Sequence, residues 1–514
     1  MKTKLFVFVS LFVITAFTNL NCIDYYVSPS GDDNNTGTEL LPFKTIQKAA
    51  DVAVGGDNIY IKEGVYNEHV ILKNTKPDLL IIRSNPGDTA IIDGTGFDVY
   101  WSGIVDIVGQ QNIHIEGLRV INSNGTGFWC DSSRNITIIA NSTYNTASSG
   151  IAAWNSNSII IYRNKIDNAC SNMSQECLTV AGCDSFETRD NSVSKCYKEG
   201  MCFKDGSRNG EVERNIVYDV INKLGIYVDA WDKHTFNINV YNNVVHNCNS
   251  GVVLASEMGG LLENIWVYNN ILYDNKFLGI DVSYNGDDTT VKVHPIKDVY
   301  IINNTVVNNG QEWGGGIANS NRDATNIIVR NNICSNNLSF QIAHEGINPS
   351  NMEIDHNLIW GFRDYPDEER GTDYVEADPM FTDTTAKNFH IILGSPAIDA
   401  GSPTDAPIFD FEYNLRPYGN GFDIGAYEYY PIGAVEIEND ETNIEISPNP
   451  FSDFCVIKTE AFADIEIFDS FGRSIIKAKG QIVWEPDFNL SEGVYFVSGR
   501  FNNKTLTKPL IFLK

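Results

Sequence analysis

The chain has 514 residues, with 37 Lys or Arg against 66 Asp or Glu, so its formal net charge at pH 7 is −29. A surface this acidic repels phosphate groups, which argues against binding to nucleic acid or to anionic membranes. The same composition suits a secreted, soluble protein, and it supplies many carboxylates that could hold calcium.

The N-terminal segment has the pattern of a secretory signal peptide. Lys2 and Lys4 give it a charged start, and residues 5–17 are almost wholly apolar. This apolar run is too short for a membrane span, and no other stretch is long and apolar enough to be one. We predict that residues 1–22 direct export and are removed, and that the protein has no transmembrane segment.

An amphipathic helix is predicted near the start of the mature chain, opening at Thr45 shortly after Pro42. Its apolar residues follow the helical spacing i, i+3, i+4, i+7 and i+8: Ile46, Ala49, Ala50, Ala53 and Val54. Because most of them are alanine, this face can pack closely against a neighbour. We expect the helix to cover the first turn of the following domain, since the end of a repeat protein exposes apolar surface and unpaired strand edges.

An asparagine recurs through the middle of the chain at the end of one short phrase, Asn-hydrophobe-x-hydrophobe-x-x-Asn, as in Asn135–Asn141 and Asn264–Asn270. The recurrence has steps of 23 to 34 residues and includes these positions: Asn141, Asn164, Asn191, Asn215, Asn243, Asn270, Asn304, Asn332 and Asn357. A period of this size is typical of stacked supersecondary units. A polar, loop-rich surface would also contain many asparagines, but it would not keep the spacing.

Each repeat contains two or three short runs in which apolar and polar residues alternate. Alternation over so few residues predicts strands, and no helical stretch separates them, which argues against a βαβ sheet. We therefore predict an all-β chain in which residues 23–430 form a right-handed parallel β-helix, with coils roughly 4.8 Å apart. The asparagines should lie at one corner of successive coils, where each can pass an amide hydrogen bond to the next.

Four short segments frame this region. Tyr26–Gly31 and Gly55–Tyr66 flank the predicted helix, and Gly394–Gly401 and Asp423–Glu428 stand at the other end. Together they resemble the opening and closing segments of pectate-lyase-like β-helix proteins, over about residues 25–430. The resemblance implies a pectin-lyase-like solenoid but little about chemistry, because one fold supports many functions.

The chemistry is expected on one strand of several coils, each of which begins with glycine and then alternates: Gly150–Trp154, Gly200–Lys204, Gly225–Asp229, Gly251–Ala255 and Gly279–Ser283. Residues two and four after each glycine should point outward on one face. That face and its adjoining loops collect charged and aromatic residues: Trp154, Lys204, Asp205, Arg208, Tyr227, Asp229, Trp231, Asp232, Lys233, His234, Glu257 and Asp281. Such a cluster is typical of a polysaccharide groove, and the alternative is a solvated charged face.

Within this cluster, two phrases are one coil apart, Glu199–Lys204 and Gly225–Asp232. They resemble the calcium-binding coils of family 9 polysaccharide lyases. That family has an Asp-Gly-Phe-x-x-Lys phrase, whose first Asp is replaced here by Glu199. One coil later the family has an Asp-Asp-Gly-x-Asp phrase, whose paired Asp is replaced here by Lys223-Leu224. The resemblance implies a calcium ion, for which the candidate ligands are Asp205, Asp229, Asp232 and Glu257. The candidates for contact with the sugar are Trp154, Tyr227, Trp231, Arg208 and His234.

Three functions stay open at this level. In a lyase, which we favour, Lys204 would abstract the proton beside a uronate carboxylate that calcium neutralises, although Asp229 one coil away would weaken Lys204 as a base. In a glycoside hydrolase, two carboxylates would flank the bond, Asp229 with either Asp281 or Glu257. The third alternative is a non-catalytic carbohydrate-binding or surface protein.

Five of the ten cysteines fall within 33 residues: Cys170, Cys177, Cys183, Cys196 and Cys202. Cys170 and Cys196 are about one repeat apart, as are Cys177 and Cys202, so each pair could form a disulfide in an exported protein. Stacked, buried free thiols fit the spacing equally well. The absence of a Cys-x-x-Cys pair argues against zinc.

Residues 444–514 form a second predicted module, after a charged linker over residues 431–443. Four motifs follow one another there: Ile446–Phe451, Ile467–Arg473, Gly493–Phe496 and Lys508–Lys514. In this order they resemble the type IX secretion C-terminal sorting domain. The resemblance implies a small antiparallel β-sandwich that an outer-membrane translocon reads and that is usually cleaved, in a Bacteroidota-type bacterium. We expect a secreted or cell-surface monomer that acts on a polysaccharide; an immunoglobulin-like binding module is the alternative.

Overall fold

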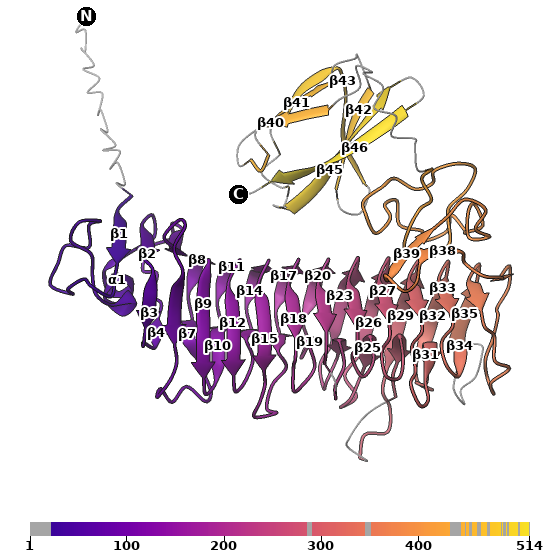
Figure 1. The fold of residues 1–514 in the computed structure, drawn as a ribbon, viewed down its shortest axis with the longest axis horizontal. Coiled ribbons are helices and arrows are strands. Elements are labelled where there is room, and N and C mark those ends of the chain that lie inside the picture. The colour runs from indigo at the N-terminus through magenta and orange to yellow at the C-terminus, as the bar shows by residue number, and fades with distance from the viewer. Residues whose placement is uncertain are drawn as a thin grey trace, which may run out of the picture.

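The structure is a computed structural model that describes residues 22–514 except 221, 285–289, 345–350, 432–443, 448, 452–454, 460–463, 470–472, 485, 487–489, 491–492, 502–503 and 513–514. An elongated stack of strands is followed by a small β-domain at the C-terminal end (Figure 1). Nearly all of the predicted signal peptide and linker lies outside the described residues. Within the described residues, no helix is long and apolar enough to cross a membrane.

Three parallel sheets run along the stack, and the chain enters them in rotation. Sheet 1 contains β4 (Val70–Ile71), β7 (Gly103–Val108), β10 (Thr126–Asp131), β13 (Ile151–Trp154), β16 (Leu178–Ala181), β19 (Met201–Lys204), β22 (Ile226–Asp229), β25 (Val252–Ala255), β28 (Ile280–Val282), β31 (Gly315–Asn319) and β34 (Phe340–Ala343). Sheet 2 contains β1 (Asp24–Val27), β2 (Asn58–Ile61), β5 (Leu80–Ser84), β8 (Gln111–Glu116), β11 (Arg134–Ile139), β14 (Asn157–Tyr162), β17 (Asp184–Arg189), β20 (Arg208–Glu213), β23 (Thr235–Tyr241), β26 (Leu262–Tyr268), β29 (Ile296–Ile302), β32 (Thr325–Arg330) and β35 (Met352–Asp355). Sheet 3 contains β3 (Gly64–Tyr66), β6 (Ala90–Asp93), β9 (Leu118–Ser123), β12 (Ser142–Thr146), β15 (Lys165–Ala169), β18 (Ser192–Ser194), β21 (Ile216–Tyr218), β24 (Val244–His246), β27 (Ile271–Tyr273), β30 (Thr305–Val307), β33 (Ile333–Ser335), β36 (Leu358–Trp360) and β37 (Val375–Glu376).

The strand pairing confirms the predicted parallel β-helix. In sheet 2, Ile159 pairs with Phe186, and Phe186 pairs with Gly210, so successive coils take 27 and then 24 residues, the same steps as the asparagines. Alternate side chains of each strand point inward and form one continuous apolar core along the stack. The period seen in the sequence is therefore the length of one coil.

The asparagine ladder forms as predicted. From Asn141 to Asn357, the backbone N–H and the side-chain amide of each ladder residue donate to the Oδ1 atom of the next; at Asn243 both bonds to Asn270 are 3.0 Å long. The residue just before each ladder asparagine has a positive φ of 50° to 57°, as at Arg163 and Asn242, which turns the chain sharply. The ladder satisfies buried polar groups that this corner would otherwise leave unpaired.

Steric crowding explains why glycine precedes the strands of sheet 1. A Cβ atom on Gly225 would lie 2.3 Å from Cγ1 of Val245, and one on Gly251 would lie 2.4 Å from the carbonyl oxygen of Gly279. Only hydrogen fits where neighbouring coils approach this closely. The glycines therefore let successive coils stack in the same register, which aligns the residues that follow them.

Helix α1 (Ile46–Val52) is the predicted capping helix. Thr45 is its N-cap residue and accepts a hydrogen bond from the backbone N–H of Lys48 at 3.2 Å. Ile46, Ala49 and Ala50 are buried and belong to the same core as the first coil. The helix therefore covers the apolar end of the stack.

A closing segment, residues 377–431, follows the last coil and contains the hairpin of β38 (Phe381–Asp383) and β39 (Asn388–Ile391). The two motifs that resemble closing segments lie side by side, since Asp399 N–H donates to Asp423 Oδ1 at 2.7 Å and Ile424 N–H donates to the Ala397 carbonyl at 3.0 Å. Both motifs therefore belong to one structural unit.

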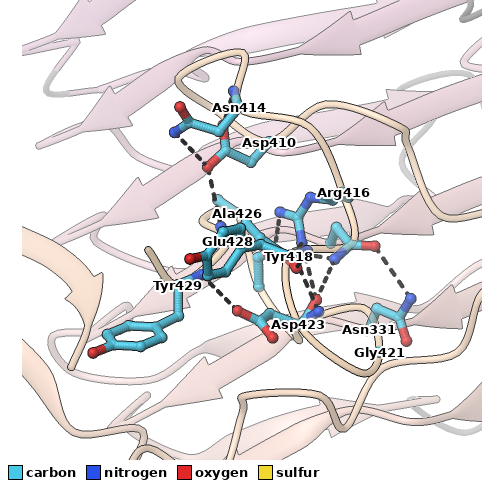
Figure 2. A network of polar contacts seen from close by, with 12 residues as sticks. Asn331, Asp410, Asn414, Arg416, Tyr418, Gly421, Asp423, Ala426, Glu428 and Tyr429 are labelled. Carbon is cyan, nitrogen blue, oxygen red and sulfur yellow. Dashed lines mark hydrogen bonds and ion pairs between the residues drawn. The ribbon is translucent and has the colours of Figure 1, made fainter. Parts of the chain in front are cut away.

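A buried polar network holds the closing segment together (Figure 2). The Arg416 guanidinium and the Glu428 carboxylate are fully buried and 3.1 Å apart. Asp410 accepts the backbone N–H groups of Glu428 and Asn414 at 3.1 and 2.8 Å. Burial raises the pKa of Asp423 to about 6 and that of Glu428 to about 7, despite the nearby Arg416 charge. An ion pair and backbone hydrogen bonds therefore join Arg416, Asp423 and Glu428 within the closing segment.

The C-terminal domain is a small antiparallel β-sandwich, as predicted. One sheet contains β40 (Ile444–Ser447), β41 (Cys455–Thr459) and β44 (Gln481–Trp484), and the other contains β42 (Asp464–Phe468), β43 (Ser474–Lys479), β45 (Gly493–Phe501) and β46 (Lys504–Phe512). The domain has its own apolar core, separate from that of the β-helix. Phe496 contacts the closing segment, with its ring centroid 4.4 Å from that of Phe409.

The five clustered cysteines are buried free thiols, which is the second of the two predicted alternatives. Cys170, Cys177 and Cys196 are buried in the core. Cys202 lies instead on the outer face of sheet 1, packed with Tyr227 and its neighbours. A Cys177–Cys202 disulfide therefore does not match the structure, in which all described cysteines are free thiols.

Candidate active site

The outer face of sheet 1 carries two columns of side chains. One contains Ala152, Thr179, Cys202, Tyr227, Val253 and Asp281, and the other contains Trp154, Ala181, Lys204, Asp229 and Ala255. The strands singled out from the sequence therefore present their outward residues on one face. Tyr227, Asp229 and Asp281 are buried there, where the sequence predicted solvent exposure, because turns that carry Glu176 and Glu257 fold over the face.

Lys204 is held in an ion pair. Its Nζ atom lies 2.8 Å from Oε1 of Glu176, in the turn just before β16, and both side chains are largely buried. Burial alone would lower the pKa of Lys204, but the attraction of Glu176 outweighs it and raises the pKa. The same ammonium lies 5.7 Å from the ring centroid of Trp154. Lys204 is therefore held as a cation.

Asp229 and Glu257 form the second half of the cluster. The backbone N–H of Glu257 donates to Oδ1 of Asp229 at 3.1 Å, and the Tyr227 hydroxyl donates to Oε1 of Glu257. Burial, helped by the Glu257 charge and opposed by the backbone N–H groups of Trp231 and Glu257, raises the pKa of Asp229 to about 7. The Tyr227 hydrogen bond meanwhile stabilises negative charge on Glu257. The two neighbouring carboxyl groups are therefore placed in electrostatically different environments.

Asp281 is farther from this pair than its repeat position suggests. The register places it in the Tyr227 column, not in the Asp229 column, and the Ser320 hydroxyl donates to it at 3.4 Å. Of the two hydrolase pairs considered from the sequence, Asp229 with Glu257 is the one in direct contact.

Of the remaining predicted residues, Arg208 begins strand β20 of sheet 2, and Trp231 and His234 lie on the turn between sheets 1 and 2. Arg208 pairs with Asp184 at 2.9 Å, and His234 contacts Glu263 at 3.0 Å, so both are engaged on the sheet 2 side. Trp231 is 41% exposed, and its backbone, not its ring, contacts Asp229. The structure therefore brings together Tyr227, Asp229 and Glu257, and on the same face Lys204 and Trp154, but it does not bring Arg208 or His234 to them.

The four predicted calcium ligands do not converge. Asp229 already accepts backbone N–H groups, Asp232 is exposed, and burial raises the pKa of Asp205 beside Lys204. Within the described ranges, no group of three or more His, Cys, Asp or Glu side chains is placed to hold a metal ion. The residues as they stand therefore do not fit a calcium ion, and no catalytic step below depends on one.

Two sets of residues escaped the sequence analysis. Glu176 lies in an irregular turn, where no alternation marks it. On sheet 2, Glu187 pairs in register with Glu211, with Glu213 two residues farther along the same strand. They line a cavity of about 1290 Å³ together with the closing segment and the C-terminal domain. Their 24-residue spacing, equal to the Asn191-to-Asn215 step, was the signal that could have revealed them.

Two family models match most directly. The model described as "Right handed beta helix region" matches residues 81–235 and 167–296, and "Secretion system C-terminal sorting domain" matches residues 445–513. A model of a protein of unknown function matches residues 29–77, which include the capping helix. These matches cover the two modules that the sequence and the structure separate.

Two relatives are similar over most of the chain. The uncharacterized protein YwoF of Bacillus subtilis is 25% identical over 438 residues, 73% of this chain and 92% of its own length. Pectate lyase PEL9 of Emericella nidulans is 24% identical over 374 residues, 68% of this chain and 76% of its own length. Among solved structures, XylC in complex with xylose has a TM-score of 0.53 and 13% identity, covering 78% of this chain and 98% of XylC. That likeness shows the fold alone. The chain is a pectate-lyase-like, right-handed parallel β-helix protein with a C-terminal type IX secretion sorting domain.

Proposed function

We propose that the protein is a secreted glycoside hydrolase whose catalytic carboxyl groups are Asp229 and Glu257. The observation that carries this proposal is the contact between the two residues, with the pKa of Asp229 raised to about 7 and Glu257 stabilised as an anion by Tyr227. Carboxyl groups with opposed environments are the usual arrangement for glycoside hydrolysis, in which one acts as an acid and the other as an anion.

The proposed reaction assigns one role to each carboxyl group. Asp229 donates its proton to the glycosidic oxygen, so the leaving sugar departs as an alcohol. Glu257 attacks the anomeric carbon and forms a glycosyl ester; water then breaks this ester and returns a proton to Asp229. This retaining course needs the two carboxyl groups about 5 Å apart.

Two further residues on the outer face of sheet 1 fit a sugar ligand. The Trp154 indole N–H is buried and has no hydrogen-bond partner among the described residues, so it can donate to a ligand hydroxyl. Lys204, held as a cation by Glu176, adds a positive charge to the same face.

A polysaccharide lyase is the second candidate, because the PEL9 relative is a pectate lyase. That reaction would require Lys204 to give up its proton and act as the base, with calcium on the substrate carboxylate. The ion pair with Glu176 opposes this role by raising the pKa of Lys204.

The exported protein incubated with a panel of polysaccharides separates these proposals. A hydrolase releases reducing ends without ultraviolet absorbance from an unsaturated product, whereas a lyase produces that absorbance and should lose activity on calcium chelation. Glu257→Ala should be inactive but form a glycosyl azide when azide is added, because azide fills the space of the lost nucleophile. Asp232→Asn, on the exposed turn, is the matched control and should keep full activity. Unsaturated product from the wild type would reject the hydrolase.

A further inference from the structure

A pair of tryptophans lies on the outer face of sheet 1, toward the N-terminal end of the stack. The register places Trp129 of β10 beside Asp106 of β7, and it places Trp154 of β13 beside Asp131 of β10. Both tryptophans are half-buried, and their indole rings stack with centroids 6.1 Å apart and planes at 28°. The two rings therefore form one aromatic surface, three and four strands away from Asp229 in β22.

A histidine and an aspartate with unused hydrogen-bonding capacity adjoin this surface. His69 directly precedes β4, and its Nε2 atom lies 3.8 Å from Oδ2 of Asp106, which is longer than a hydrogen bond. His69 Nε2 and Asp106 Oδ1 have no hydrogen-bond partner among the described residues. The two side chains are 26% and 14% exposed, so a ligand can reach them. A hydroxyl oxygen can bridge two polar groups that stand this far apart.

The Trp154 ring connects this surface to the candidate active site. The Lys204 ammonium lies 5.7 Å from the ring centroid, although Ala181 stands between the two residues in their column, because the alanine side chain is too small to separate them. Lys204 is followed in the same column by Asp229. With strands about 4.8 Å apart, Trp129 lies roughly 19 Å from Asp229 along the stack, a distance that only a chain of several sugar residues can span.

The charges around the two tryptophans indicate which kind of sugar fits. Asp106 and Asp131 flank the pair with carboxyl groups, and the charge of Lys204 is balanced by Glu176 at 2.8 Å. A uronate carboxylate would be repelled by both aspartates. A neutral sugar would not be repelled, since its apolar ring face can pack on an indole and its hydroxyl groups can both donate and accept hydrogen bonds.

We propose that Trp129, Trp154, Asp106 and His69 form a second saccharide-binding site, which takes a neutral sugar residue of the same glycan chain. The two indole rings bind the face of the sugar. The His69–Asp106 pair and the Trp154 indole N–H, which has no partner among the described residues, bind its hydroxyl groups. The substrate is then a neutral polysaccharide that lies along the stack. Its cleavage at Asp229 rests on the proposed function, whereas the binding site itself does not.

Binding to a protein that cannot cleave tests the site without an activity assay. The full-length chain with Glu257→Ala is run through gels that contain galactan, xylan or glucomannan as neutral probes, or polygalacturonate or alginate as uronate probes. We expect at least one neutral probe, and neither uronate, to retard the protein. Trp129→Ala in the same background should weaken that binding about tenfold. Retardation by a uronate, no retardation by any neutral probe, or unweakened binding in Trp129→Ala would overturn the proposal.

Two control variants separate the site from the general effect of losing a tryptophan. Trp129→Phe keeps an aromatic ring at the same position and should bind within about threefold of the parent. Trp360→Ala removes a tryptophan that is 39% exposed at the end of β36 in sheet 3, and it should leave binding unchanged. A loss in Trp360→Ala equal to that in Trp129→Ala would show that sheet 1 does not hold the glycan.

Substrate length tests the link between this site and cleavage. In the chain with Glu257 intact, Trp129→Ala should lower kcat/KM about tenfold on a long oligosaccharide of the retarding glycan, because binding energy from the remote site is lost. It should leave kcat/KM on the corresponding disaccharide unchanged, since a disaccharide at Asp229 does not reach Trp129. Equal losses on both lengths would overturn the extended binding of the chain. If no glycan is cleaved at all, the proposed function fails, while the binding measured with Glu257→Ala stands.

Discussion

The outer faces of sheets 1 and 2 each contain a carboxyl with a strongly raised pKa, buried at Asp229 and half-buried at Glu211, yet the surroundings differ. Burial raises the pKa of Asp229 on sheet 1 to about 7 and that of Glu211 on sheet 2 to about 8. Beside Asp229 stands a second carboxylate with a hydroxyl donor, and three strands away on the same sheet the Trp154 indole N–H has no partner among the described residues. Glu211 is bonded to Asn239 at 2.9 Å and stacked on Glu187.

The neighbours of Glu211 are largely engaged with one another and with the closing segment. Glu213 accepts the Tyr413 hydroxyl and the Arg214 guanidinium, and Arg214 also holds Asp190 at 2.7 Å. A raised pKa identifies both faces as candidates, but structural networks produce it as well as active sites do. Sheet 1 differs from sheet 2 because, in addition to its buried carboxyl, it has a hydrogen-bond donor that a ligand can use, the Trp154 indole N–H.

Exchange of the two carboxyls for amides gives the largest expected difference between the faces. Asp229→Asn cannot donate the catalytic proton and should lower kcat by about 10³-fold. Glu211→Gln keeps the shape and the bond to Asn239 and should change kcat by less than about threefold. Reducing-end release by the two purified variants is the measurement. The reverse pattern would move the active site to sheet 2.

Removal of the Glu176 charge that pairs with Lys204 distinguishes a lyase from a hydrolase on sheet 1. Glu176→Gln removes the charge that raises the pKa of Lys204, so the lysine loses its proton more readily. In a lyase this would raise the rate at neutral pH, whereas in the hydrolase it should lower the rate about tenfold, because a positioned cation is lost. The sign of the change, followed from pH 6 to 9, is the readout. An increase would favour the lyase.

The asparagine ladder supports the register on which both faces depend. Asn243 is 0% exposed and contributes two hydrogen bonds to Asn270, so Asn243→Leu should lower the free energy of unfolding by about 2–3 kcal/mol. Asn237→Gly removes two exposed bonds, to Asn209 and from Asn264, and tolerates the positive φ of 55° at this position, so it should cost less than about 1 kcal/mol. Thermal unfolding of both variants checks this. Equal losses would mean that burial of the ladder adds nothing.

The fold was predictable because the coil is a local repeat. The alternation of apolar and polar residues in each strand and the one asparagine per coil directly predict the stack of coils. The register of the repeats then correctly predicts that Tyr227 and Asp229 lie on the outer face of the same sheet. The contacts that define the site were not predictable in the same way. Glu176 reaches Lys204 from an irregular turn, Glu257 reaches Asp229 through its backbone, and a turn's path depends on side chains of other coils. The predicted solvent exposure of Asp229 was wrong for the same reason, because those turns cover its side chain.

The smallest expected effect compares the two faces through the pH dependence of stability. A carboxyl whose folded pKa is raised contributes stability below its unfolded pKa, near 4, and loses it as the pH rises through the folded value. For Asp229 that loss ends near pH 7, and for Glu211 near pH 8. Asp229→Asn and Glu211→Gln, which cannot ionise, should therefore each gain stability relative to the wild type as the pH rises. We expect about 1–2 °C in melting temperature, with the Glu211→Gln gain still growing above pH 7. Melting curves from pH 4.5 to 9 are the measurement. A gain for Asp229→Asn that continues to grow above pH 8 would show that its carboxyl is not the more acidic of the two, and the acid role assigned to it near neutral pH would fail.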